Sequence, residues 1–268
     1  MVDLRRIAYH GARVLTEQRR RTILRLLSDQ TTVRLSEICA RFGVSAATAR
    51  RDAEAIARSA LARRTRGGLL APDTSLSEPI YSRKAVAAAG TKTRLGQLAA
   101  TLLPEDGSIF IDAGSTSLEV ARAVLDRPKL RIYTNSVTLL AIASEGRATV
   151  YSLGGEVRTV SLALVGAFAL NWLERLRFDA AVVGASGIDA EQGASTTELA
   201  EATVKIEALK RARLRVLVAH SEKWDKPAAL QFAPWSAFHH FVTDKSPPKP
   251  GRALLASAGV HLHLLTHK

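Results

Sequence analysis

Cysteine is almost missing from this chain of 268 residues, in which Cys39 stands alone. A single cysteine excludes an internal disulfide and any zinc site built from several cysteines, so we expect Cys39 to be a small core residue. Apolar runs long enough to span a bilayer are also missing. Residues 1–13 are basic but lack the apolar stretch of a signal peptide. We therefore expect a cytoplasmic protein without a membrane partner.

Lysine is absent from residues 1–72, although this segment contains 15 arginines and six acidic residues. The segment therefore carries +9 of the chain's formal charge of +13, which leaves +4 for residues 73–268. Such an asymmetry predicts a nucleic-acid-binding segment joined to a nearly neutral domain. The length and a hydrophobic content of 47% are sufficient for two domains, one small and one of ordinary size.

Within the basic segment, two apolar stripes predict two consecutive helices. The stripes consist of Ile23, Leu26 and Leu27, followed by Leu35, Ile38, Cys39 and Phe42. Gly43 can adopt the left-handed conformation that ends the second helix, and Ser45 can cap a third. Arg34 is a poor cap for the second helix, so Thr32 is the alternative. This order of elements is that of a helix-turn-helix.

The third helix, starting at Ala46, has one apolar and one basic face at about 100° per residue. The apolar face consists of Ala49, Ala53, Ile56 and Ala60, and the opposite face of Ala47, Arg51, Glu54 and Arg58. Arginines in the first turns of an outward-facing helix fit the DNA major groove. We expect Arg51 to contact base edges and Arg50 to contact a phosphate or a flanking base. Asp52 is expected to orient an arginine or to pair within the domain.

Residues 61–70 predict a β-hairpin wing, because basic residues precede a Gly67-Gly68 turn between apolar residues. Its arginines are expected to face the DNA backbone. A charged helix face alone is usually only solvated, but helix pair, turn, basic helix and basic wing occur here in order. The expected DNA-binding residues are Ser45, Ala47, Thr48, Arg50, Arg51, Arg63, Arg64 and Arg66.

Strands and helices alternate after a short polar connector at residues 72–79. Buried strands are predicted at 108–112, 130–134, 150–153, 180–184, 215–219 and 240–243, and helices at 91–103, 117–125, 164–176 and 200–212. This alternation is typical of a mainly parallel sheet with helices on both faces.

Small polar residues follow four successive predicted strands, where ligands of such sheets bind. After the first strand, Gly114 lets the backbone approach a ligand, and Ser115 and Thr116 can hold an anion at a helix start. Asp112 would repel a phosphate, so we expect it to bind sugar hydroxyls or to orient the loop. The expected pocket residues are Asp112, Gly114, Ser115, Thr116, Thr134, Asn135, Gly154, Gly155 and Ser186, with Lys205 and Lys223 as candidates for holding phosphate. No cofactor is expected.

Taken together, these motifs resemble the DeoR-type bacterial transcriptional repressors over nearly the whole chain, from residue 15 to 265. The resemblance is carried by residues 42–45, Thr48, 50–52, 66–68, 112–116, 134–136, 153–155, 165–166, 178–179, 184–189, Lys205, Ser221, Lys223 and 243–244. It implies a winged helix-turn-helix followed by a Rossmann-like, sugar-phosphate-isomerase-like, mainly parallel α/β domain. It also implies an operator-binding repressor of carbohydrate metabolism genes that a phosphorylated sugar releases.

We accordingly expect an N-terminal extension at 1–14, a winged helix-turn-helix at 15–71, a linker at 72–90 and an effector domain at 91–268. Paired operator sites would require a dimer or a higher assembly, such as a tetramer. Two departures from the family pattern concern the pocket: His220 stands where the family usually has aspartate, and Glu222 is an additional acid. In the recognition helix, Ala46, Ala47 and Ala49 leave base readout to Arg50 and Arg51.

Three alternatives remain open. The first is a sugar-phosphate isomerase-like enzyme with an accessory DNA-binding domain, for which Asp112, Asp189 and Glu198 are the acid–base candidates; no acid–base pair at a defined spacing supports it. The second is a nucleoid-type DNA binder without an effector. The third is a metal site at His239, His240, His261 and His263. The alternating, strand-like context of these histidines favours no metal.

Overall fold

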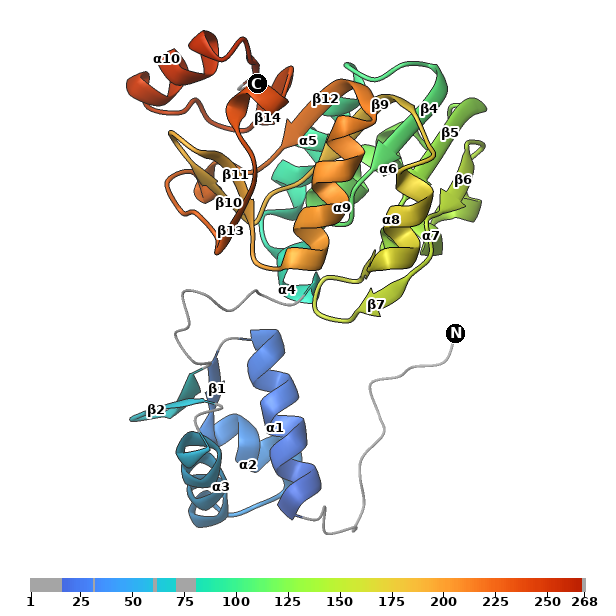
Figure 1. Cartoon of the computed structure of the whole chain (residues 1–268). Coiled ribbons are helices and arrows are strands. Elements are labelled where there is room, and N and C mark those ends of the chain that lie inside the picture. Colours follow the sequence, from blue (N-terminus) through green and yellow to red (C-terminus); the bar gives the residue numbers. More distant parts are fainter. Residues whose placement is uncertain (1–15, 31, 60–61, 71–80, 267–268) are drawn as a thin grey trace. The chain divides into compact units, whose positions relative to one another are not determined.

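The computed structural model describes residues 16–30, 32–59, 62–70 and 81–266. The chain divides into two compact units, Met1–Ser75 and Leu76–Lys268 (Figure 1). Their cores are separate clusters of buried side chains. Within the described ranges, no helix has both the length and the apolar character needed to cross a membrane.

The first unit consists of three helices and a small antiparallel sheet. The helices are α1 (Thr16–Gln30), α2 (Leu35–Phe42) and α3 (Ala46–Arg58), and the strands are β1 (Thr32–Arg34), β2 (Arg63–Thr65) and β3 (Gly68–Leu70), in the order β1-β3-β2. Ile23, Ile38, Ala53 and Leu69 are fully buried between these elements. The helix-turn-helix predicted from the apolar stripes is confirmed.

The caps explain where these helices begin and end. Gly43 ends α2 in the left-handed conformation, with φ 61°, and the Ser45 hydroxyl accepts the Thr48 N–H at 3.2 Å. The expected cap at Thr32 is wrong, because Thr32 belongs to strand β1. The Leu35 N–H at the start of α2 instead donates to the carbonyl of Gly67 at 2.9 Å, so the wing caps this helix.

The hairpin turn lies one residue earlier than expected. Thr65 pairs with Gly68, which places Arg66 and Gly67 in the turn and Gly68 in strand β3. Gly68 also packs directly against the Val33 carbonyl of β1, where a side chain would clash. Strand β1, which joins the hairpin to form the sheet, was not predicted. It has three residues, of which one is buried, and this is too short to show the alternation of apolar and polar residues that marks a strand.

The second unit is built on a seven-stranded parallel sheet in the order β15-β14-β12-β9-β4-β5-β6. Its strands are β4 (Asp106–Ile111), β5 (Lys129–Thr134), β6 (Thr149–Ser152), β9 (Phe178–Val183), β12 (Ala212–Val218), β14 (His240–Thr243) and β15 (His261–Leu264). Five of the six predicted strands match these within a few residues, and the sixth coincides with β14. The predicted mainly parallel sheet is therefore confirmed.

Helices cover both faces of this sheet (Figure 1). The helices described in this unit are α4 (Tyr81–Val86), α5 (Ala89–Ala100), α6 (Ser115–Val124), α7 (Val137–Ala141), α8 (Ala167–Leu173), α9 (Leu199–Lys210) and α10 (Lys249–Ser257). Side chains alternate along each central strand: Ile109 and Ile111 pack with α5 and α6, whereas Phe110 packs with α8 and α9. Two layers of apolar side chains thus fix the sheet and its strand ends.

Several short elements complete the second unit. The 3₁₀ turns are η1 (Ala143–Glu145), η2 (Ser221–Lys223) and η3 (Trp235–Ala237); β7 (Glu156–Arg158) and β8 (Ala163–Val165) form a hairpin; and β10 (Gly187–Asp189), β11 (Gly193–Thr196) and β13 (Leu230–Ala233) form a small antiparallel sheet. The helix expected at 164–176 is shorter than predicted, because Ala163–Val165 pairs with β7.

The linker expected at 72–90 is wrong in its second half. Residues 81–86 form α4, and α5 begins at Ala89, both within the second unit. Residues 72–80, like the expected extension at 1–14, lie outside the described residues. The error arises because a six-residue helix is too short to show a helical period in the sequence.

Candidate functional site: a basic recognition surface and an anion pocket

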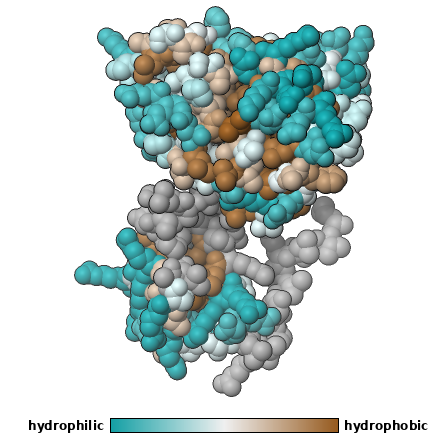
Figure 2. All heavy atoms as spheres, in the orientation of Figure 1, coloured by the Kyte–Doolittle hydropathy of each residue, from teal (hydrophilic) through white to brown (hydrophobic). Residues whose placement is uncertain are grey.

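The outward face of α3 is basic and open to solvent. Ala47, Arg50 and Arg51 are exposed, whereas Ala49 and Ala53 on the opposite face are fully buried. The Arg51 Nε–H donates to the Ala47 carbonyl one turn earlier in the same helix, at 3.5 Å. In Figure 2 hydrophilic atoms extend outward from this unit. Two adjacent guanidinium groups on one exposed helix face have the geometry for contacting phosphates and guanine edges in a major groove.

Asp52 is not part of that surface. Its carboxylate is 1% exposed and accepts bonds from the Nε atoms of Arg19, at 2.6 Å, and Arg20, at 2.9 Å. These bonds join the middle of α3 to the start of α1. Of the two roles expected for Asp52, the one that the structure shows is pairing within the domain.

The wing adds arginines next to α3. Arg63 and Arg66 are exposed on the hairpin, but Arg64 donates to the Glu54 carboxylate at 2.7 Å and to the Arg50 carbonyl at 3.4 Å. Arg64 thus ties the wing to the recognition helix. Because an exposed ion pair contributes at most about 1 kcal/mol, the Arg64–Glu54 pair adds little to the stability of this unit.

In the second unit, the order in which strands are added to the sheet reverses between β4 and β9. From β4 the chain adds β5 and β6 on one side, and from β9 it adds β12, β14 and β15 on the other. A crevice is expected at the carboxyl ends of the strands at such a reversal. A cavity of about 310 Å³ lies there, between the loops that follow β4, β9 and β12.

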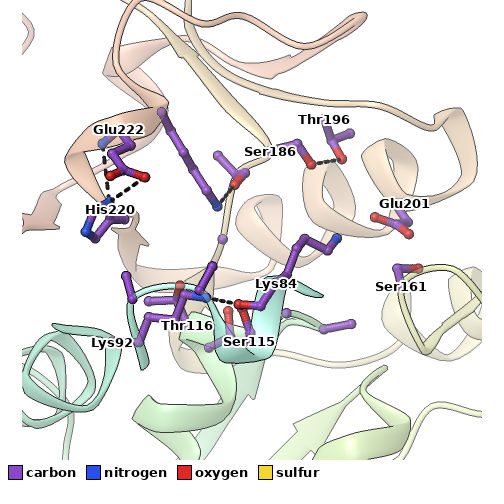
Figure 3. Close-up of a pocket in the computed structure, with 18 of the residues that line it drawn as sticks. Lys84, Lys92, Ser115, Thr116, Ser161, Ser186, Thr196, Glu201, His220 and Glu222 are labelled. Atoms are coloured by element: carbon purple, nitrogen blue, oxygen red, sulfur yellow. Dashed lines mark hydrogen bonds and ion pairs between the residues drawn. The ribbon is translucent and has the colours of Figure 1, made fainter. Parts of the chain in front are cut away.

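The floor of this cavity is the start of helix α6 (Figure 3). Gly114 has a φ of 151°, which lets the chain turn sharply into the helix, and Ser115, Thr116 and Ser117 follow in its first turn. Ser117 is one of the residues that line the cavity, and its hydroxyl is completely buried and has no hydrogen-bond partner among the described residues. A helix N-terminus with unused donors is a favourable place for an anion.

Asp112 lies beneath that floor and holds it in place. Its carboxylate accepts bonds from the Lys205 ammonium and from the Gly184 N–H, the latter at 3.1 Å. Burial raises the pKa of the Asp112 carboxyl, and the Lys205 ammonium opposes this shift. Asp112 therefore joins the ends of β4 and β9 to α9. Of the two roles expected for it, binding sugar hydroxyls or orienting the loop, these bonds correspond to the second.

Five lysines border the cavity, against two glutamates, Glu201 and Glu222. They come from helices α4, α5 and α9 and from the segment that follows β12, and are Lys84, Lys92, Lys205, Lys223 and Lys226. Burial, together with the nearby charges of Lys84, Lys92 and Lys205, lowers the pKa of Lys223 to about 7. Burial and the charge of Lys84 also lower the pKa of Lys92. Such crowding of positive charge strongly favours an anionic ligand.

The two departures from the family pattern lie at one end of the cavity. His220 and Glu222 both border it, and the Glu222 N–H donates to His220 Nδ1 at 3.3 Å (Figure 3). His220 Nε2 lies 3.4 Å from the Asp244 carboxylate, which also accepts from the Ser221 N–H at 2.6 Å. The carboxylate of Asp244, which directly follows β14, thus lies beside the histidine in this turn.

The structure brings some of the expected pocket residues together and separates others. Gly114, Ser115, Thr116, Ser186, Lys205 and Lys223 border the cavity. Thr134 and Asn135 are buried beside it: the Asn135 side-chain carbonyl accepts the Ala113 N–H at 2.8 Å and so supports the floor.

Gly154 and Gly155 lie outside the cavity. They follow β6, which is two strands away from β4, at the far edge of the sheet. There Gly154 packs under the Phe168 ring and Gly155 against the Val165 carbonyl. The sequence analysis placed these glycines in the pocket because they follow one of four successive strands. The pocket is instead lined by the loops that follow β4, β9 and β12.

The lining residues that the sequence reasoning missed include Lys84, Lys92, Ser161, Thr196, Glu201 and Lys226. Lys84 and Lys92 belong to the segment that was divided between linker and helix, and the Lys84 side chain extends toward the side of the cavity that carries Glu201 (Figure 3). The spacing of residues in the sequence did not indicate that either lysine lines a pocket. The excess of lysine in residues 84–92 over the arginine-rich segment before it was the only available hint.

Two of the histidines considered for a metal site lie close together. His240 Nδ1 and His263 Nε2 lie 3.0 Å apart on adjacent parallel strands. Within the part of the chain that the structure describes, no group of three histidine, cysteine or acidic side chains is placed to hold a metal ion.

A basic helix-turn-helix unit joined to an α/β unit with an anion pocket is the architecture of a ligand-responsive DNA-binding regulator. The DeoR-like helix-turn-helix domain model matches residues 19–75, and the model of the DeoR C-terminal sensor domain matches residues 87–245. The chain belongs to the DeoR family of transcriptional regulators, as the sequence motifs predicted.

Two relatives illustrate matches along nearly the whole length of both chains. The HTH-type transcriptional regulator GlpR of Haloferax volcanii is 33% identical, over 92% of this chain and 97% of that protein. The glycerol-3-phosphate regulon repressor of Escherichia coli K12 is 29% identical, over 92% of this chain and 98% of that protein. Among solved structures, ribose 5-phosphate isomerase A of Methanocaldococcus jannaschii matches with 15% identity and a TM-score of 0.40, over 52% of this chain and 56% of that one.

Proposed function

We propose that this protein is an operator-binding repressor of carbohydrate metabolism genes that a phosphorylated sugar releases from DNA. The observation that carries the proposal is the pocket: a helix start with an unused buried hydroxyl, surrounded by five lysines, on the same chain as a basic recognition helix. The name of the Escherichia coli relative, a glycerol-3-phosphate regulon repressor, supports a phosphorylated polyol or sugar as the ligand class.

The residues that would contact each part of such a ligand follow from the cavity's charge. The α6 start, with Ser115 to Ser117, and the ammonium groups of Lys92 and Lys223 would hold the phosphate. Ser186, Thr196 and Glu201 offer hydroxyl and carboxylate partners for sugar hydroxyls on the opposite side (Figure 3). No further cofactor is needed, and a homodimer or tetramer would present paired recognition helices to a two-fold operator.

The hydrogen bonds of the three acidic residues considered for catalysis favour a regulator over an enzyme. Asp112 is held by Lys205 and Gly184, and the Asp189 carboxylate accepts the N–H groups of Glu191 and Gln192, both at 2.8 Å. Glu198 caps α9 by accepting the Glu201 N–H at 3.1 Å. Each acid proposed for catalysis therefore has a structural task. Turnover of a phosphosugar by the purified protein would overturn this part of the proposal.

Operator binding by Arg51→Ala tests the recognition helix. A DNA fragment selected by the wild-type protein from random sequence serves as the probe, at one fixed salt concentration. We expect the variant to lose about 1–3 kcal/mol of binding free energy and to lose preference at one base position. Arg58→Ala, which removes an exposed arginine from the last turn of the same helix, is the matched control and should retain base preference. Equal effects of the two substitutions would contradict the assignment.

Titration with phosphosugars tests the pocket. Phosphorylated sugars and glycerol 3-phosphate are added to the wild-type complex with its selected operator, and the unphosphorylated compounds serve as controls. At least one phosphorylated compound should release the DNA at constant ionic strength, while its unphosphorylated partner should not. Release by neither would contradict control by a sugar phosphate, even if the DNA binding itself is confirmed.

A further inference from the structure

Helix α4 is short and loosely packed. It spans six residues, Tyr81–Val86, and is the first described element of the second unit. The Tyr81 side chain is partly buried, with its hydroxyl enclosed, whereas Val86 at the other end is 79% exposed. Because a helix of this length is unstable alone, its position depends on a few bonds to its surroundings.

Those bonds are concentrated at the two ends of α4. The Tyr81 N–H donates to the Val160 carbonyl at 2.7 Å. At the other end, the Lys84 carbonyl accepts the Ser115 hydroxyl at 3.1 Å and also the Lys92 ammonium. Carbonyls in the last turn of a helix lack intrahelical partners, and a cation there is favourable, so these two side chains act as the C-terminal cap of α4.

Both donors of this cap border the anion pocket (Figure 3). Ser115 opens α6, where an anion would bind, and Lys92 lies beside it. A serine hydroxyl carries one hydrogen and can donate to only one acceptor at a time. An anionic oxygen is a stronger acceptor than a peptide carbonyl, so a bound phosphate competes directly with Lys84 for this hydrogen.

We propose that an anionic ligand draws the Ser115 hydroxyl and the Lys92 ammonium away from the Lys84 carbonyl and thereby uncaps α4. The helix then loosens, and the chain that leads back to the DNA-binding unit loses its fixed attachment point on the sensor unit. This inference rests on the proposed function, because it needs an anion in the pocket. It explains how occupancy could reach the recognition helix without any movement of the parallel sheet.

Hydrogen exchange of the full chain tests the cap. The amides of residues 81–86 are followed without ligand, with saturating inorganic phosphate and with saturating glycerol 3-phosphate. In the wild-type protein, ligand should speed exchange in α4 and slow it at residues 114–118. Loss of one hydrogen bond corresponds to a change of about two- to tenfold in local opening.

Two serine variants separate the cap from the anion site. Ser115→Ala should speed exchange in α4 about two- to tenfold without ligand, and ligand should then add little. Ser117→Ala is the matched control: its hydroxyl borders the cavity without a described partner, so the variant should weaken ligand binding and leave ligand-free α4 unchanged.

The possible failures are distinguishable. Slower exchange of α4 in saturating ligand, or equal ligand-free exchange in the two serine variants, overturns the uncapping proposal and leaves the proposed function standing. Calorimetry of the same wild-type sample detects binding independently. If neither glycerol 3-phosphate nor any phosphosugar binds, the proposed function and this inference are both contradicted.

Discussion

Among single residues, Lys223 lies in surroundings that disfavour its charge. Its ammonium donates to the Ala185 carbonyl, but three other lysines act on it, and its pKa in the folded protein is about 7. The ordinary lysine pKa of about 10.4 applies to the unfolded chain. The unfolded chain therefore binds more protons between pH 7 and pH 10, so the free energy of unfolding must rise with pH in this range.

For the ligand-free protein we expect this rise to reach up to about 2 kcal/mol between pH 7 and pH 9. Urea unfolding in buffers without phosphate measures it, and Lys223→Met should be more stable than wild type at pH 7 and have a flatter profile. Lys249→Met, an exposed lysine at the start of α10, is the control and should retain the wild-type slope. A wild-type slope in Lys223→Met would contradict the assignment.

At the scale of elements, α3 carries two acids with opposite surroundings. Asp52 is buried between Arg19 and Arg20, whereas Glu54 lies on the exposed face beside Arg64. Replacing either carboxylate by an amide removes the same charge from the same helix. Removal of a partner from a buried ion pair costs about 3–5 kcal/mol, whereas an exposed pair contributes about 0–1 kcal/mol.

We therefore expect Asp52→Asn to destabilise the DNA-binding unit by about 3 kcal/mol or more, and Glu54→Gln by less than about 1 kcal/mol. Denaturant midpoints of the two variants, followed by a signal from the first unit, give the comparison. Similar losses in both would show that the α1–α3 ion pairs do not stabilise this unit.

The elements also show what the sequence could and could not predict. Helices with clear apolar stripes and strands buried on both faces were predictable, because a repeated environment leaves a period in the residues. α4, β1 and the β7–β8 hairpin were not, since three to six residues carry no measurable period. Only part of the pocket was predictable. The small polar residues of the loop at Gly114 indicated a binding loop, but the contribution of the loop after β12 depends on the strand order, which no local sequence pattern contains.

At the scale of the whole molecule, the two units have separate cores and divide the charge unequally. A fragment of residues 76–268 should therefore fold alone, since it contains both apolar layers of the large sheet. We expect it to bind glycerol 3-phosphate as the full chain does and to lose affinity for the selected operator. Calorimetry and gel-shift titration check the two statements, and a fragment that fails to bind the ligand, despite a folded circular dichroism spectrum, would contradict the division of tasks.

The crowded lysines of the pocket have one more consequence, for selectivity. A cavity that attracts any small polyanion is in competition with inorganic phosphate and other common anions, which raise the apparent dissociation constant of the true effector. Charge alone then sets a background occupancy, and the contacts proposed between the sugar hydroxyls and Ser186, Thr196 and Glu201 would distinguish one phosphate ester from another. The response threshold of such a regulator would depend on the ionic composition of its surroundings as well as on the amount of its effector.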